Sequence, residues 1–202
     1  GSTLAIGAHR NDGNGSNSGH VRVYQKVVGY WSQVGQDING ETAGDFSGFS
    51  VSLSADGSIL AIGAYNNDGT GSNAGHVRVY QNVGGTWTQV GVDINGEAAN
   101  DQSGYSVSLS ADGTTLAIGA HRNDGNGSNA GHVRVYNFNG TAWTQLGIDI
   151  NGEAAGDESG SSVSLSSDGS TLAIGAPKNS GNGTQRGHVR VYQNVGGTWT
   201  QI

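Results

Sequence analysis

The sequence contains no cysteine, no methionine and a single proline among its 202 residues. The absence of cysteine does not decide the compartment, because repeat domains outside the cell can dispense with disulfides when each unit packs on its neighbour. The absence of oxidisable sulfur is compatible with an extracellular protein. No run of about 18 apolar residues occurs, so the sequence predicts no membrane span. Helical periodicity is missing as well.

Basic residues are also scarce, with 9 Lys and Arg against 16 Asp and Glu and a net charge of −7. A chain this acidic is a poor partner for nucleic acid or an anionic membrane, and is better suited to collecting cations. We therefore predict no nucleic-acid partner. The opening Gly1-Ser2-Thr3-Leu4 matches the interior Gly169-Ser170-Thr171-Leu172. We expect the chain to be cut from within a repeat of a longer protein, with any targeting segment outside it.

What the sequence does have is a repeat of 56 residues. The pentad LAIGA begins at Leu4, Leu60, Leu116 and Leu172, and the hexad GHVRVY begins at Gly19, Gly75, Gly131 and Gly187. Self-similarity at a fixed period is typical of one structural unit that has been copied. We predict a single repeat domain over residues 1–202. It divides into a partial blade at 1–34 and repeat units at about 35–90, 91–146 and 147–202.

Each unit reads as four short strands. In the second unit, apolar residues alternate with polar ones at 51–54 and 76–81, while 59–64 is apolar on both faces and 86–94 carries the tryptophan. Asp56-Gly57 and Gly84-Gly85 predict tight turns between strands, and residues 66–74 predict a polar loop. The small residues Ala61, Gly63 and Ala64 should allow a neighbouring sheet to come close.

These strands predict an all-β fold, a β-propeller built of tandem four-stranded antiparallel blades. A parallel β-helix and a linear array of small sheets are the rivals. The first unit lacks one SVSLS strand, so about four blades, a fragment of a larger propeller and a longer array all fit. In a closed ring, the last strand at 199–202 would pair with the first.

The run from Gly104 to Ala120, GYSVS…DG…LAIGA, resembles the FG-GAP repeat of integrin α-subunit propellers and bacterial surface proteins. The fourth copy completes the signature as Gly175-Ala176-Pro177, whereas the other copies have His9, Tyr65 and His121 in place of the proline. The resemblance implies propeller blades with roles in extracellular adhesion or ligand binding, often with calcium in blade loops. The loop that holds calcium in that family precedes the LAIGA-type strand, where this chain has too few carboxylates.

Another set of loops spaces oxygen side chains at relative positions 1, 3, 5 and 9, a pattern that suits Ca²⁺. The same residues can instead form Asx-type turns, in which they accept backbone N–H groups. The candidate ligands are Asp37, Asn39, Glu41 and Asp45; Asp93, Asn95, Glu97 and Asp101; and Asp149, Asn151, Glu153 and Asp157.

A second set of loops alternates oxygens in the pattern DGNGS. With one carboxylate per loop, each is either a weak calcium site or a solvated glycine turn, and the fourth copy has Ser180 in place of the aspartate. The candidate ligands are Asp12, Asn14, Asp68, Asp124 and Asn126.

Aromatic residues and histidines are candidates for ligand contact. Trp31, Trp87, Trp143 and Trp199 either stack on sugars or supply the one large core residue that a glycine-rich sheet needs. A polar stripe is formed by His20, Arg22 and Tyr24 and by their copies. These side chains either contact a ligand or pack between blades, with each Arg paired to an Asp on the adjacent sheet. His9 and His121 occupy the same position in the loops of two repeats, and the residue at this position varies between copies. Such variation is consistent with ligand contact or with random sequence drift.

No catalytic constellation stands out from the repeats, since catalytic sites are asymmetric and these copies are nearly identical. The sequence therefore predicts a non-catalytic propeller module at the cell surface or secreted. Its role would be adhesion or binding of a protein or glycan ligand, with calcium as a candidate stabilising ion. The alternatives are a lectin-like carbohydrate-binding propeller and a subunit of an extracellular fibre. Such a fibre would self-associate through strand complementation between chain ends.

Overall fold

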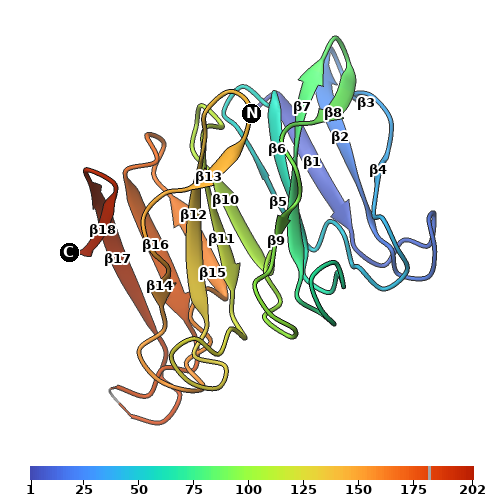
Figure 1. Cartoon of the computed structure of the whole chain (residues 1–202). Coiled ribbons are helices and arrows are strands. Elements are labelled where there is room, and N and C mark those ends of the chain that lie inside the picture. The colour runs from blue at the N-terminus through green and yellow to red at the C-terminus, as the bar shows by residue number, and fades with distance from the viewer. Residues whose placement is uncertain (182) are drawn as a thin grey trace.

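A computed structural model describes residues 1–181 and 183–202, and in these residues the regular structure is a row of four antiparallel sheets (Figure 1). The first sheet contains β1 (Thr3–Ala8), β2 (His20–Val27), β3 (Tyr30–Gln33) and β4 (Ile38–Asn39). The second contains β5 (Ser50–Leu53), β6 (Ile59–Ala64), β7 (His76–Val83), β8 (Thr86–Gln89) and β9 (Ile94–Asn95). The third contains β10 (Ser106–Leu109), β11 (Thr115–Ala120), β12 (His132–Phe138), β13 (Trp143–Gln145) and β14 (Ile150–Asn151). The fourth contains β15 (Ser162–Leu165), β16 (Thr171–Ala176), β17 (His188–Val195) and β18 (Thr198–Gln201).

The prediction of an all-β fold made of four-stranded antiparallel blades is confirmed. In the second sheet the strand order is β5-β6-β7-β8, and both predicted hairpin turns are present. Leu53 pairs with Leu60 across the Asp-Gly turn, where Gly57 has φ of +74° and Ser54 Oγ donates to Asp56 at 2.6 Å. Val83 pairs with Thr86 across the Gly-Gly turn. The turn residues thus set the register of each sheet.

The single strand predicted at 86–94 is wrong, because the chain divides there into β8 and β9. Both strands pair with β7. The strand β8 pairs with residues 80–83 of β7, and β9 pairs with His76 and Val77. The break contains Gly91, where an added Cβ would lie 2.9 Å from Cδ1 of Trp143 in the next sheet. The strand is therefore interrupted where that indole needs room. Residues 38–39 pair with β2 and so belong to the first sheet, although they lie after residue 35, where the first full repeat unit was predicted to begin.

The hydrophobic core lies between adjacent sheets rather than within one sheet. Leu60 and Ile62 of β6 point back to the first sheet, where they pack on Val21 and Val23, whereas Ala61 points forward to the third sheet. The same alternation recurs at the third and fourth sheets. This arrangement explains why the LAIGA strand is apolar on both of its faces.

The expected close approach at the small residues of LAIGA is present. A Cβ added to Gly63 would overlap the carbonyl oxygen of Gly104 in the strand connection to the third sheet, and one added to Gly119 would overlap that of Gly160. Only glycine leaves room for the neighbouring backbone here.

The first strands of the second, third and fourth sheets are linked to one another by serine hydroxyls. Ser50 Oγ donates to the carbonyl of Gly104 at 2.7 Å, and Ser52 Oγ accepts the amide of Leu109 at 3.0 Å. Ser106 and Ser108 repeat both contacts with the fourth sheet. The polar positions of SVSL are thus used for sheet-to-sheet hydrogen bonds.

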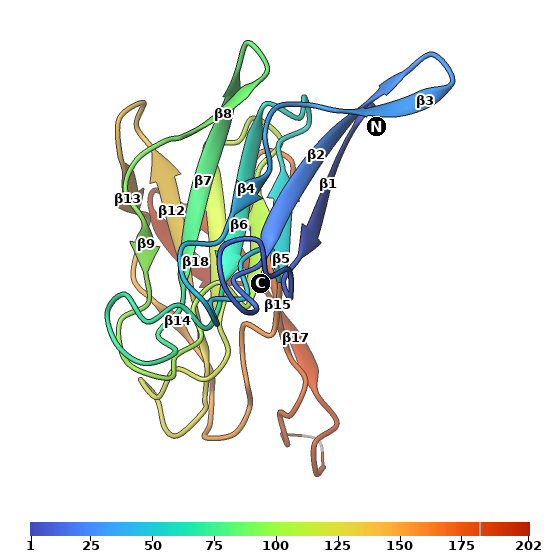
Figure 2. The ribbon, with the colours of Figure 1, turned by 90° about the vertical axis from the view of Figure 1, so that its right-hand side faces the viewer.

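The sheets do not close into a ring. The first and fourth sheets lie at opposite ends of the row (Figures 1 and 2), and within the described residues β18 pairs only with β17, so the pairing of 199–202 with the first strand does not occur. The first sheet has no counterpart of β5, as its sequence predicts. A search of the described residues for a helix that could cross a membrane finds none.

Candidate functional site

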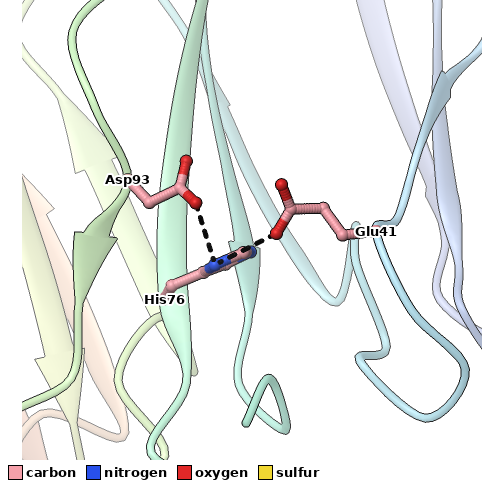
Figure 3. Close-up of side chains that lie close together, drawn as sticks. All are labelled: Glu41, His76 and Asp93. Atoms are coloured by element: carbon pink, nitrogen blue, oxygen red, sulfur yellow. Dashed lines mark ion pairs between the residues drawn. The ribbon is translucent and has the colours of Figure 1, made fainter. Parts of the chain in front are cut away.

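Two groups of side chains gather at the end of the sheets where β6 ends and β7 begins, the lower end in Figure 1. The first group is built around the histidine that starts the third strand of each repeat. His76 is the first residue of β7, is only 1% exposed, and lies between two carboxylates (Figure 3). Its Nδ1 is 3.8 Å from Oε2 of Glu41 and 3.9 Å from Oδ2 of Asp93. We call Glu41, His76 and Asp93 the first carboxylate–histidine cluster.

The cluster forms across two sheets. Glu41 follows β4 of the first sheet, whereas His76 and Asp93 belong to the second sheet. Glu97, His132 and Asp149 form a second carboxylate–histidine cluster between the second and third sheets, with distances of 3.8 and 3.9 Å. Two partial copies have two members each, His20 with Asp37 at 3.7 Å and His188 with Glu153 at 3.6 Å.

Burial and the neighbouring carboxylates control the charges in the first cluster. The pKa of His76 is lowered to about 4, mainly because the ring is buried and then because Arg78 is close. The imidazole is therefore neutral at neutral pH. The pKa of Glu41 is raised, mainly by burial and also by repulsion from Asp93 and Asp45, although Arg78 opposes this shift.

A pocket of about 490 Å³ opens beside the first cluster. Three carboxylates line it, from Glu41, Asp68 and Asp93, and no residue of its lining is basic. The other lining residues are Thr42, Asn67, Gly69 and Asn95. The structure therefore brings together one carboxylate from each of three loops that the sequence treated separately.

Within one DxNGE loop, however, the four oxygen-bearing residues do not converge. Asp45 is buried and accepts the amide and hydroxyl of Thr42 at 2.9 and 2.7 Å, and Asp101 and Asp157 likewise accept the amides of Ala98 and Ala154. Each of these three aspartates thus accepts the backbone N–H of the residue three positions earlier, a local hydrogen bond within its own loop.

The remaining positions of the loops have other partners. Asp37 accepts Nε and a terminal N–H of Arg22 at 2.9 and 2.8 Å, and these hydrogen bonds, with one from Gln33, lower its pKa to about 2. Asp93 and Asp149 accept side-chain amides from Gln89 and Gln145 at 2.7 Å. The carbonyl groups of Asn39, Asn95 and Asn151 accept hydrogen bonds from Arg78, Arg134 and Arg190 at 2.6–2.7 Å.

The DGNGS loops are held by hydrogen bonds of the turn type. Asp12, Asp68 and Asp124 each accept the amide of the asparagine five residues later at 2.7 Å. The side chains of Asn14 and Asn126 donate to carbonyl groups of the DxNGE loop beside them, those of Gly40 and Gly152 at 2.8 Å. In the fourth copy Ser180 Oγ accepts the amide of Gln185 at 3.1 Å in the same manner. Of these five candidates, Asp68 lines the pocket.

Three of the four GHVRVY arginines link neighbouring sheets, Arg78, Arg134 and Arg190, whereas Arg22 binds Asp37 of its own sheet. Arg78 donates to the carbonyl of Asn39 in the first sheet at 2.7 Å and lies 3.6 Å from Oε1 of Glu41. Its guanidinium carbon is 5.6 Å from the ring centre of Tyr80. Arg78 therefore contacts the preceding blade through a backbone carbonyl and a glutamate, instead of the expected aspartate.

The tryptophans also pack between sheets. The Nε1 atoms of Trp87, Trp143 and Trp199 donate to the carbonyl groups of Val34, Val90 and Leu146 in the preceding sheet at 3.0–3.2 Å. Trp87 is 3% exposed, whereas Trp31 in the first sheet is 45% exposed. Trp87 is thus a core residue, whereas Trp143 and Trp199 are partly buried and pack against the core clusters.

The second group at this end is a cluster of six aromatic rings, which we call the aromatic rim. Phe46 stacks on Tyr65 with 5.6 Å between the ring centres. The ring centre of Phe49 lies 4.6 Å from that of Tyr65 and 4.9 Å from that of Tyr105. The ring centres of Tyr105 and His121 are 3.9 Å apart. His9 meets Phe49 at 5.4 Å. The rings join because His9, Tyr65 and His121 follow the LAIGA strands β1, β6 and β11. Phe49 and Tyr105 precede β5 and β10, whose antiparallel pairing with β6 and β11 brings these ends together.

Two arginines flank the aromatic rim although the chain is acidic overall. Arg10 and Arg122 are exposed and follow His9 and His121 directly. Both act to lower the pKa of Tyr65, which burial and Tyr105 nevertheless raise. Lys178, at the matching position of the fourth repeat, is 2.7 Å from Glu158.

Sequence reasoning singled out His9 and His121 but missed the four other rings of the aromatic rim. The available signal was the variation between copies, since Phe46 is replaced by Gln102 and Glu158, and Phe49 by Tyr105 and Ser161. For the carboxylate–histidine clusters no local motif exists. Their members come from successive repeats and meet only when the sheets pack.

Comparison with known families matches the FG-GAP repeat at residues 39–80, 95–136 and 151–192, together more than half of the chain. The chain belongs to the FG-GAP repeat family. The matches are 56 residues apart and each runs from the last short strand of one sheet to the third strand of the next. No match is found among curated proteins.

Solved structures similar to this FG-GAP chain include two described as lactonases and one described as a β-propeller domain. A candidate 6-phosphogluconolactonase of Bacteroides uniformis matches with a TM-score of 0.63 and 11% identity over 91% of this chain and 47% of its own. The Pseudomonas aeruginosa periplasmic gluconolactonase matches with a TM-score of 0.55 and 16% identity, over 95% of this chain and 49% of its own. A third match is the β-propeller domain of the trilobed protease of Pyrococcus furiosus, which is described as having an open velcro topology. Its TM-score is 0.54 and its identity 12%, over 100% of this chain and 54% of its own. At these identities the similarity shows the fold alone, and this chain spans about half the length of each.

Proposed function

We propose that this FG-GAP chain is part of a non-catalytic, extracellular adhesion module that binds an acidic glycan at the aromatic rim. The observation that carries the proposal is where the rings lie. The repeats are nearly identical along their strands, yet they differ at the positions of the aromatic rim, and there they place six aromatic side chains side by side.

The chemistry of the aromatic rim supports a glycan in particular. Five of the six rings are at least partly exposed, whereas His121 is buried as a neighbour of Tyr105. Exposed aromatic faces offer apolar area with little conformational entropy to lose, which suits the C–H faces of sugar rings. Arg10 and Arg122 on either side supply planar donors for carboxylate or sulfate groups, which favours uronates and sulfated sugars. The extracellular setting follows from the adhesion roles that the resemblance to integrin-type repeats implies.

Binding to oligogalacturonate, compared with neutral cello-oligosaccharide, tests the proposal. We expect wild-type protein to bind oligogalacturonate and Tyr65→Ala to weaken that binding at least tenfold, because the central ring of the aromatic rim is removed. Tyr30→Ala is the matched control, since Tyr30 is 61% exposed and starts β3 at the opposite end of its sheet. Equal losses in both variants, or preference for the neutral oligosaccharide, would contradict the proposal.

The lactonases among the similar structures call for a direct assay of catalysis. We expect this chain to leave the hydrolysis rate of glucono-δ-lactone at its uncatalysed value, measured by titration of the acid released at constant pH. A rate that rises in proportion to protein concentration would contradict the non-catalytic role. Calcium binding and self-association through strand complementation stay predictions of the sequence.

A further inference from the structure

We propose that each carboxylate–histidine cluster binds a divalent first-row transition metal, represented by Zn²⁺, between adjacent sheets. In each cluster one histidine nitrogen and two carboxylate oxygens lie within 4.8 Å of one another. Imidazole and carboxylate are ordinary ligands of Zn²⁺, at about 2.0–2.2 Å each. A modest side-chain movement toward a common point would complete three bonds, with water in the remaining position. An all-oxygen site would instead favour Ca²⁺.

The histidine is buried without the hydrogen bonds that a structural histidine normally makes. His76 is 1% exposed, and its Nε2 has no hydrogen-bond partner among the described residues. Its Nδ1 points at the carboxylates of Glu41 and Asp93 from 3.8 and 3.9 Å, too far for a hydrogen bond to either (Figure 3). A buried polar ring left this way costs free energy. A cation held by Nδ1 and the two carboxylates would account for its orientation.

The carboxylates of the first cluster keep oxygens free for such a cation. Arg78 makes its short contact, 2.7 Å, with the carbonyl of Asn39, and its distance to Glu41 is 3.6 Å. Asp93 accepts from Gln89 through Oδ1, whereas Oδ2 is the oxygen that faces His76. In the first sheet Arg22 instead binds Asp37 directly, at 2.8 and 2.9 Å.

The pocket beside the first cluster adds negative charge and access. Asp68 lines it together with Glu41 and Asp93, and its volume of about 490 Å³ leaves room for water ligands. The second cluster repeats the same distances from independent residues, with Arg134 donating to the carbonyl of Asn95 at 2.7 Å and 3.7 Å from Glu97. Two complete clusters predict two metal ions per chain.

Zn²⁺ titration of the whole 202-residue chain, followed by isothermal calorimetry, tests the proposal by stoichiometry. We expect two ions per wild-type chain, one for Glu41→Gln and none at these sites for the double variant Glu41→Gln, Glu97→Gln. Glutamine keeps the shape of the side chain and removes its charge. Glu158→Gln is the control, because Glu158 pairs with Lys178 outside both clusters, and it should keep two ions.

Thermal unfolding gives a second readout. Because each ion would join two sheets, Zn²⁺ should raise the melting temperature of wild-type protein and EDTA should reverse the rise, with no rise in the double variant. Unchanged stoichiometry in the double variant, or no Zn²⁺ binding by wild-type protein, would overturn the proposal and leave the clusters as contacts between a neutral histidine and two carboxylates. Tighter binding of Ca²⁺ than of Zn²⁺ at the same residues would overturn the assignment of the metal class.

Discussion

Single residues determine how closely the sheets of this FG-GAP chain approach one another. The glycine of LAIGA is the clearest case, since Gly63 and Gly119 face a carbonyl oxygen of the following sheet with no room for a Cβ. At the same repeat position in the fourth sheet, an added Cβ on Gly175 meets only the hydroxyl of Ser162, a side chain that can turn away. One residue type thus has two environments in one molecule.

This difference predicts a matched pair of alanine variants. Gly63→Ala should destabilise the fold by about 1–3 kcal/mol, because the backbone of the third sheet must move to admit the methyl group. Gly175→Ala should cost much less, since only a serine rotamer changes. Urea unfolding followed by circular dichroism measures both values, and an equal loss in the two variants would contradict the close approach of the sheets at Gly63.

At the scale of elements, the strands of each sheet serve their neighbours as much as their own sheet. The serines of SVSL bond to the next first strand, the arginine of GHVRVY reaches back to a carbonyl of the preceding sheet, and the indoles do the same. The interface between sheets is therefore the unit of stability, as in other repeat proteins whose units bury their faces on each other.

The tryptophans test this view with a pair from one molecule. Trp87→Ala should destabilise the fold by about 3–5 kcal/mol, because a buried indole and its hydrogen bond to Val34 are both lost. Trp31→Ala, at the same repeat position but 45% exposed, should cost about 1 kcal/mol or less. Comparable losses in thermal or urea unfolding would contradict the packing role of Trp87.

The strands, their order and the turns between them could be predicted from the sequence, because alternation and the Asp-Gly and Gly-Gly pairs are local signals. The division of β8 from β9 could not, since it depends on Trp143 of another sheet. The carboxylate–histidine clusters were out of reach for the same reason: Glu41 and His76 are 35 residues apart and meet only across packed sheets. The partners of the loop carboxylates were equally out of reach, since Asp37 binds Arg22, Glu41 faces His76 of the next sheet and Asp45 binds Thr42.

At the scale of the whole molecule, four nearly identical sheets in an open row place different chemistry at one end. The aromatic rim extends across the first three sheets and ends at the fourth, where Pro177 and Ser161 occupy the positions equivalent to its rings. Repetition provides the scaffold, and the departures from repetition provide the surface that we assign to ligand binding.

Aromatic ¹³C–¹H NMR during titration with oligogalacturonate is the most direct test of this assignment, because it reports each class of ring separately. The account predicts shifts of the Tyr65, Tyr105, His9 and His121 signals that saturate together, with the Trp87 signals unmoved. Shifts confined to Trp31 and the other tryptophans, or no saturable shift of the aromatic rim, would contradict it.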